Sequence, residues 1–157
     1  ERGVEKLPSY DRYHEWQEQV RRAYIIYLSG AYGAYYYHNT AWDVIKPEPE
    51  SPGMKRFQIL KESLAPLPYW RMEPSSHLAI GGPCLALPGE AYAFYVEGAQ
   101  LTVNLRQLED SGKVSARWIN TWDGTRETVS VRPGIHRLKK PQSFGNAPGL
   151  LIVRAAQ

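Results

Sequence analysis

Apolar residues in the first third of the chain recur with the spacing of amphipathic helices. In the first such stretch they stand three or four positions apart, as on one helix face: Trp16, Val20, Ala23, Tyr24, Tyr27 and Leu28. This pattern predicts a helix that begins near Asp11, a suitable N-cap. A second helix is predicted over residues 53–65. Ser51 would cap this helix, Pro52 suits its first position, and Pro66 would stop it.

The segment between these two helices, from Gly33 to His38, is rich in aromatic residues that favour strands. It is apolar on both faces, as expected of a strand buried between other elements. Because a lone strand leaves its backbone groups without hydrogen bonds, this one needs a partner. The partner would be the edge of the following sheet, strands missing from this chain, or a second copy of the chain.

After Trp70 the apolar positions follow a period of two, which is the pattern of half-buried antiparallel strands. Strands are predicted by this pattern over residues 91–96, 101–106 and 113–118, and further ones near 77–87, 126–131, 134–139 and 149–155. Short strands in this number, separated by glycine-containing turns, are typical of a β-sandwich. We therefore expect a mainly β fold, an antiparallel β-sandwich preceded by a helix–strand–helix segment. Residues 1–68 and 69–157 would form its two units.

Composition and charge argue against two classes of partner. The chain of 157 residues is 43% hydrophobic and 22% charged, as in an ordinary globular protein. Its net charge is only +3 and no block of five basic residues occurs, so no nucleic-acid partner is predicted. No apolar run approaches the roughly 20 residues that span a membrane, so no membrane partner is predicted.

The residues that hold metals or cofactors are sparse. Cys84 is the only cysteine, which excludes an intrachain disulfide and a zinc site built from thiolates. The four histidines lack metal-ligand spacing, and neither a Gly-rich phosphate loop nor a Ser-His-Asp signature is present, so we expect no metal and no cofactor. A single cysteine leaves the compartment open, because a secreted protein need not carry a disulfide.

Several segments resemble the end of a (β/α)8 barrel and an appended sandwich in a bacterial glycoside hydrolase family. The barrel-like segments are Arg21 to Tyr24, Ser29 to Tyr37 and Asn39 to Ile45, and the sandwich-like ones are Tyr69 to Pro74, Cys84 to Ala86, Gly89 to Val96 and Val114 to Asn120. The family includes apiosidase-like and uncharacterised members, and its sandwich is labelled a collagen-binding domain. The resemblance implies that the two helices are the seventh and eighth of the barrel. It also implies a parent protein that degrades polysaccharides.

This resemblance implies sugar-binding residues at the end of the eighth barrel strand, because barrel active sites lie at the carboxyl ends of strands. His38, Asn39 and Trp42 would then lie on the rim of the sugar cleft. The flat indole of Trp42 suits the apolar face of a sugar ring. Structural roles, as a loop aromatic for Trp42 and a hydrogen-bonded strand end for His38, are the alternatives.

A second group of candidates lies in the sandwich, around a turn that contains Asp123 and Gly124. Trp122 precedes this turn, where burial is not expected, so it is a candidate sugar platform. Asn120 and Asp123 are placed to hydrogen-bond a sugar beside it. The alternative for Trp122 is an indole folded over the sheet edge. Trp118 alternates in phase with apolar neighbours and is therefore expected in the core.

Catalysis requires two carboxylates that flank the glycosidic bond, and no segment of this chain matches the family's catalytic motifs. We therefore expect no hydrolysis by this chain alone. Three functions remain: a carbohydrate-binding module, a structural buttress of a catalytic barrel that the chain lacks, and a collagen-like protein-binding module. A sugar binder needs exposed coplanar aromatics, whereas a buttress would bury its aromatics against residues 1–68. The sequence favours a polysaccharide or oligosaccharide as partner.

Overall fold

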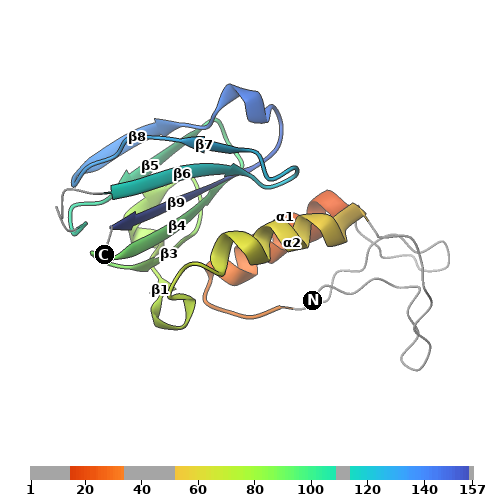
Figure 1. The fold of residues 1–157 in the computed structure, drawn as a ribbon, viewed down its shortest axis with the longest axis horizontal. Coiled ribbons are helices and arrows are strands. Elements are labelled where there is room, and N and C mark those ends of the chain that lie inside the picture. Colours follow the sequence, from red (N-terminus) through yellow and green to blue (C-terminus); the bar gives the residue numbers. More distant parts are fainter. Residues whose placement is uncertain (1–14, 34–51, 109–113, 156–157) are drawn as a thin grey trace.

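The computed structural model describes residues 15–33, 52–108 and 114–155, which form two helices and nine strands (Figure 1). The helices are α1 (Trp16–Leu28) and α2 (Pro52–Leu64), with single-turn helices η1 (Tyr69–Arg71), η2 (Ser76–Leu78) and η3 (Gln142–Phe144). The strands are β1 (Glu73–Pro74), β2 (Ala79–Ile80), β3 (Cys84–Leu87), β4 (Ala91–Val96), β5 (Gln100–Asn104), β6 (Val114–Asn120), β7 (Arg126–Thr128), β8 (Ile135–Lys139) and β9 (Gly149–Ala155).

The strands form two antiparallel sheets, which confirms the predicted mainly β fold. The larger sheet has the order β1-β3-β4-β9-β6-β7, and the smaller one has the order β2-β5-β8. The described residues form no closed barrel. Of the predicted strand between the helices, only Gly33 is described, without regular structure; residues 34–38 lie outside the described residues.

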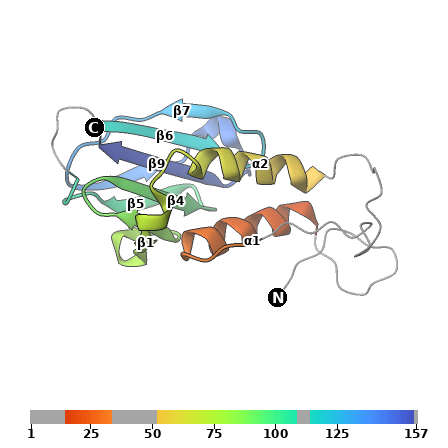
Figure 2. The same cartoon turned by 60° about the horizontal axis from the view of Figure 1, so that its bottom comes forward.

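The molecule has three layers, because α1 and α2 cover the face of the larger sheet that is turned away from the smaller sheet (Figures 1 and 2). Strand β4 shows the consequence. Tyr92 and Phe94 belong to the core between the sheets, whereas Ala93 and Tyr95 belong to the core beneath the helices. All six residues of β4 are therefore buried, and the prediction of a half-buried strand was wrong here. Strands buried on both faces need a covering layer on each side.

The two helices bury one face each, as the spacing of their apolar residues predicts. In α1 that face includes Tyr24 and Leu28, both fully buried, and in α2 it includes Leu60, which is 1% exposed. The first helix begins at Trp16 rather than near Asp11, since Glu15 is extended and occupies the N-cap position. Asp11 and Ser51 lie outside the described residues, and α2 begins at Pro52 as predicted.

The single strand predicted near residues 77–87 is divided between the two sheets. Strand β2 pairs with β5 in the smaller sheet, whereas β3 pairs with β4 in the larger one. Gly82 allows the chain to pass from the smaller sheet to the larger one close to β4, because a Cβ atom at this position would lie 1.8 Å from the carbonyl oxygen of Tyr95. The short segment between α2 and η1 also packs on the molecule, since Leu67 is 2% exposed in the core under the helices.

Candidate functional site

The three predicted sandwich residues lie together in the turn that joins β6 to β7. The side-chain oxygen of Asn120 accepts a hydrogen bond from the Trp122 backbone N–H at 2.9 Å, and its amide donates to Asp123 at 3.2 Å. The other carboxylate oxygen of Asp123 accepts from the backbone N–H of Thr125 at 2.8 Å. Both polar side chains thus hold the turn in shape, as Asx side chains commonly do.

Trp122 is half-buried and contacts the helix layer. Its ring meets that of Trp16 in α1 edge to face, with the ring centroids 5.4 Å apart and the planes at 73°. The guanidinium of Arg56 in α2 lies over the Trp16 ring, 4.4 Å from its centroid. The contact therefore ties the β6–β7 turn to both helices. The two indoles are not coplanar, so they do not form one flat platform.

A pocket of about 540 Å³ opens beside Trp122, between the start of α1 and the end of β4. Most of its lining residues have polar side chains, and Trp122 and Pro148 are its apolar residues; the polar ones are Glu15, Gln17, Glu18, Arg21, Glu97 and Asn146. Arg21 contacts Glu97 at 2.9 Å and Glu18 at 3.4 Å. The carboxylate of Glu97, more than that of Glu18, raises the pKa of Arg21. Carboxylates, an amide and a guanidinium beside an indole are groups that can bind sugar hydroxyls and a sugar ring.

Two other large aromatic residues of the sandwich, Trp118 and Tyr95, are buried. Trp118 is 2% exposed between the two sheets, which confirms its predicted core position. Tyr95 stacks on Tyr24 of α1, with ring centroids 5.2 Å apart and planes at 12°. Burial raises the pKa of both hydroxyls, and neither hydroxyl has a hydrogen-bond partner. Tyr95 therefore serves the contact between helix and sheet.

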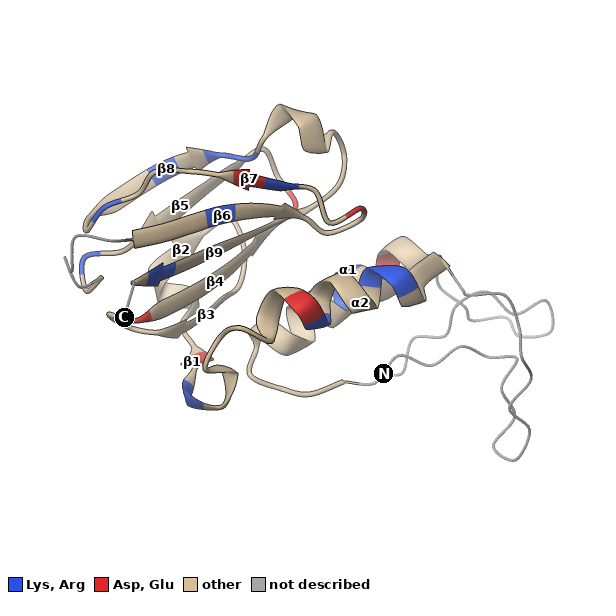
Figure 3. Ribbon diagram, in the orientation of Figure 1, with Lys and Arg blue, Asp and Glu red and all other residues tan. Residues whose placement is uncertain are grey.

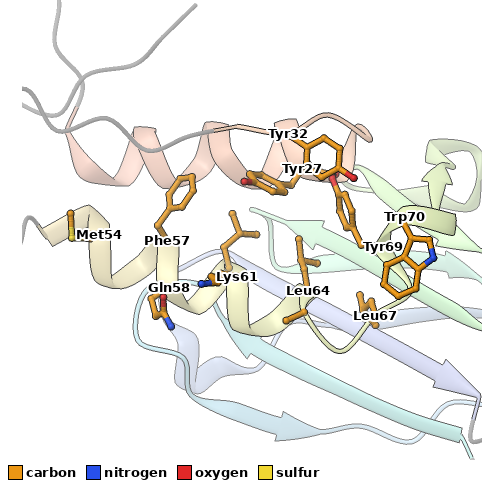
Figure 4. A pocket seen from close by; sticks show the side chains of 12 residues that line it. Tyr27, Tyr32, Met54, Phe57, Gln58, Lys61, Leu64, Leu67, Tyr69 and Trp70 are labelled. Atoms are coloured by element: carbon orange, nitrogen blue, oxygen red, sulfur yellow. The ribbon is translucent and has the colours of Figure 1, made fainter. Parts of the chain in front are cut away.

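An apolar groove of about 580 Å³ runs between the two helices and η1 (Figure 4). We name it the helix-pair groove; it is lined by Tyr27, Tyr32, Met54, Phe57, Gln58, Leu60, Lys61, Leu64, Ala65, Leu67, Tyr69 and Trp70. Trp70 is 78% exposed and Tyr32 74% exposed, so large apolar side chains are left in contact with water. Sequence reasoning missed this groove. Exposed apolar groups of this size on one surface mark an interaction site.

Hydrogen bonds fix the aromatic wall of the groove. The Tyr69 hydroxyl lies 2.7 Å from the carbonyl oxygen of Tyr27 and 3.0 Å from that of Ala31, so its single proton is shared between them. The Tyr27 hydroxyl in turn donates to the carbonyl oxygen of Gly33 at 2.7 Å. Burial raises the pKa of Tyr69 to about 12, with smaller contributions from Tyr32 and Tyr27. These hydrogen bonds hold the Tyr27 and Tyr69 rings in place at the groove.

The remaining candidates, His38, Asn39 and Trp42, lie outside the described residues, and their sugar-binding role stays a prediction. Within the part of the chain that the structure describes, no three metal-binding side chains come together. Neither described helix has the length and apolar character needed to cross a bilayer.

Two stacked antiparallel sheets with a helix pair on the larger one define a class of fold that solved structures also show. One is described as a glycoside hydrolase. It superposes with a TM-score of 0.75 and has 20% sequence identity, and the match covers 99% of this chain and 40% of that chain. Another is a glycoside hydrolase family 5 protein from Bacteroides vulgatus ATCC 8482. It superposes with a TM-score of 0.75 and has 18% sequence identity, and the match covers 94% of this chain and 38% of that chain. This chain therefore spans about two fifths of their length. It matches no protein-family model and no curated protein.

Proposed function

We propose that this chain is the C-terminal portion of a carbohydrate-active, glycoside-hydrolase-like protein, in which the sandwich supports a catalytic barrel. The observation that carries the proposal is where the aromatics lie. Tyr95 and Trp122 pack on α1, so sandwich and helices form one continuous body. A buttress predicts this arrangement, whereas a strand-face sugar binder needs these rings exposed. The likeness of the fold to two glycoside hydrolases supports the class of protein.

The helix-pair groove supports the same proposal, and its occupant in this proposal is the catalytic barrel of the parent protein. More than half of each similar solved chain lies outside the match, which is ample length for a further unit. The groove presents apolar side chains between the two helices and η1, and those of Tyr32 and Trp70 are largely exposed (Figure 4). Burying a side chain such as that of Trp70 there would contribute about 1.5–3 kcal/mol.

The test compares the isolated chain with the longer protein that contains it. Trp70→Ser should leave the melting temperature of the isolated chain almost unchanged, because the side chain is 78% exposed. In the longer protein the same change should cost about 3–5 kcal/mol, as for a buried tryptophan. Ile80→Ser is the matched control, since Ile80 is 74% exposed outside the groove and should be neutral in both. Equal effects of Trp70→Ser in both contexts would refute the proposal.

A second candidate function, carbohydrate binding by the sandwich, is supported by the pocket beside Trp122. The indole of Trp122, the amide of Asn146 and the carboxylates of Glu15 and Glu18 line one opening of about 540 Å³. In this proposal the partner is an oligosaccharide or polysaccharide. Its ring would lie against Trp122 and its hydroxyls would bind the surrounding polar groups. Sugar binding and support of a barrel can occur in the same chain, because the pocket beside Trp122 and the helix-pair groove are lined by different residues.

Affinity electrophoresis against neutral plant polysaccharides tests this second function. Trp122→Ala should abolish retardation, while Trp122→Phe should retain part of it because a flat ring remains. Loss in Trp42→Ala alone would place the sugar site at the predicted barrel rim instead. No retardation by any neutral glycan would eliminate the second function and leave the supporting role.

A further inference from the structure

Three arginines lie on three neighbouring strands of the larger sheet, on the part of its outer face beside α2. They are Arg154 in β9, Arg117 in β6 and Arg126 in β7, and all three are exposed. Figure 3 shows a basic segment on each of these strands. We name these residues the arginine row.

The strand register places the arginine row on one face. Ser115 is opposite Arg154, and Ile119 is opposite Arg126. Because alternate residues of a strand share a face, Ser115, Arg117 and Ile119 point the same way, together with their partners. Ile119 packs in the core beneath the helices, so this is the outer face. Each arginine is one strand and two positions from the next, a diagonal step of about 7–8 Å.

The charge of the arginine row is not neutralised by the described residues. No ion pair joins any of the three arginines to a described acid. Glu62 lines the same pocket as the three arginines and accepts a hydrogen bond from Gln58 at 2.8 Å. Glu127 of β7 is opposite Trp118 and so points to the other face, where it bonds to Ser143. Of the described acidic residues, Glu62 is thus the only one that shares the pocket with these three positive charges.

A pocket of about 150 Å³ lies between the arginine row and the end of α2. Ser63 of α2 contributes to its lining and is 5% exposed, and its hydroxyl has no hydrogen-bond partner. A buried hydroxyl left without a partner is destabilising, so a ligand oxygen that accepts a hydrogen bond from it would be favoured. Guanidinium groups with a free hydroxyl donor form a suitable site for a carboxylate or sulfate group.

We propose that this face binds an anionic polysaccharide, with one acidic group in the pocket at Ser63 and its neighbours along the arginine row. Regular spacing over about 15 Å, two diagonal steps, suits a polymer with repeated charges better than a single small anion. The pocket lining contains serine hydroxyls but no aromatic ring. Single-stranded nucleic acid sites combine a basic groove with aromatic stacking, so the site favours a polysaccharide. The site is distinct from the pocket beside Trp122 and does not depend on the supporting role.

The test measures binding of the purified chain to sodium polygalacturonate and to dextran sulfate by calorimetry. We expect binding to at least one of them, no binding to fully methyl-esterified pectin, and a linear fall of log affinity with log salt concentration. Binding to polygalacturonate alone specifies carboxylates, and binding to dextran sulfate alone specifies sulfates; either supports the site. No binding to either polymer, or equal binding to single-stranded DNA, overturns it.

Variants locate the site. Arg117→Ala should lower affinity about tenfold or more, because a charge-assisted hydrogen bond is lost. Arg106→Ala removes the same charge from an exposed position outside the arginine row and should change affinity less than about threefold. Ser63→Ala should weaken binding without lowering the melting temperature. If Arg117→Ala and Arg106→Ala weaken binding equally, or Arg117→Ala lowers only the melting temperature, the arginine row is not a binding site.

Discussion

Replacing single tyrosines by phenylalanine tests how the helix layer is attached to the sandwich. Tyr24 and Tyr95 stack on each other at this junction, and both are almost completely buried. Neither hydroxyl has a hydrogen-bond partner. A buried polar group without a partner costs about 1–3 kcal/mol of stability. Tyr95→Phe and Tyr24→Phe should therefore leave the free energy of unfolding unchanged or raise it by up to about this amount.

Tyr92 provides a matched control on the same strand. It is fully buried like Tyr95, but it faces the core between the sheets, and its hydroxyl accepts a hydrogen bond from the Gly89 backbone N–H at 2.8 Å. Tyr92→Phe would leave that buried N–H unpaired. We expect a loss of about 1–3 kcal/mol from this variant. Two chemically identical changes, three residues apart, should thus differ in effect, because only Tyr92→Phe lowers the free energy of unfolding.

Urea denaturation followed by circular dichroism measures these free energies, and the slope of the transition should not change between variants. For a chain of this size, about 1 kcal/mol corresponds to about 2–4 °C in melting temperature. A fall of more than about 1 kcal/mol in the free energy of unfolding of Tyr95→Phe would show that the Tyr95 hydroxyl makes a hydrogen bond. The contact between α1 and β4, which the supporting role requires, would then be packed differently from the arrangement described above.

Three further predictions concern the backbone, pH and thiol chemistry. Gly82→Ala should destabilise the chain by at least about 1–3 kcal/mol in urea denaturation, since the new Cβ would lie 1.8 Å from the Tyr95 carbonyl oxygen. Gly98→Ala is the control and should be nearly neutral, because its Cβ would lie in open space; similar effects of the two changes would contradict this prediction. Stability should fall as the pH rises above about 10, because burial raises the pKa of Tyr24, Tyr95 and Tyr69, that of Tyr69 to about 12 from 10.0, so the unfolded chain loses these protons first; Tyr69→Phe should remove only the Tyr69 contribution and make the fall between about pH 10 and 12 shallower, and an unchanged slope would contradict this. Cys84 is fully buried and burial raises its pKa to about 12, so its reaction with a thiol reagent at pH 8 should proceed at the rate of unfolding; immediate reaction would refute this.

Local patterns in the sequence predicted most of the described elements. The spacing in α1 and the alternation in β6 each carry a strong signal, because one face of each element packs on an apolar core. Pro52 marks the start of α2 as predicted, since proline suits a first helical position. The crossing at Gly82 was not predicted, because a close approach between two backbone segments depends on tertiary packing.

The candidate sites were less predictable, for a physical reason that differs between them. Trp122 was predicted as a candidate because it precedes a turn, where burial is not expected, but its contact with Trp16 joins residues far apart in the sequence. The helix-pair groove combines Tyr32 with Trp70 and becomes visible only when α1 and α2 lie side by side. The arginine row has no sequence motif at all. Its members share a face solely through the register of three strands.

The outer face of the larger sheet changes character at the edge of the helix layer, and this boundary separates the two proposed roles. Beneath the helices the face carries Ala93, Tyr95 and Leu150, which a second apolar layer must cover. Beyond the helices the same face carries Arg117 and Arg154, which are exposed and could not be covered by an apolar layer without loss of hydration. The barrel proposed to contact the helix-pair groove would therefore leave the arginine row accessible. Support and anion binding can thus coexist in one chain, and variants at Trp70 and Arg117 should affect them independently.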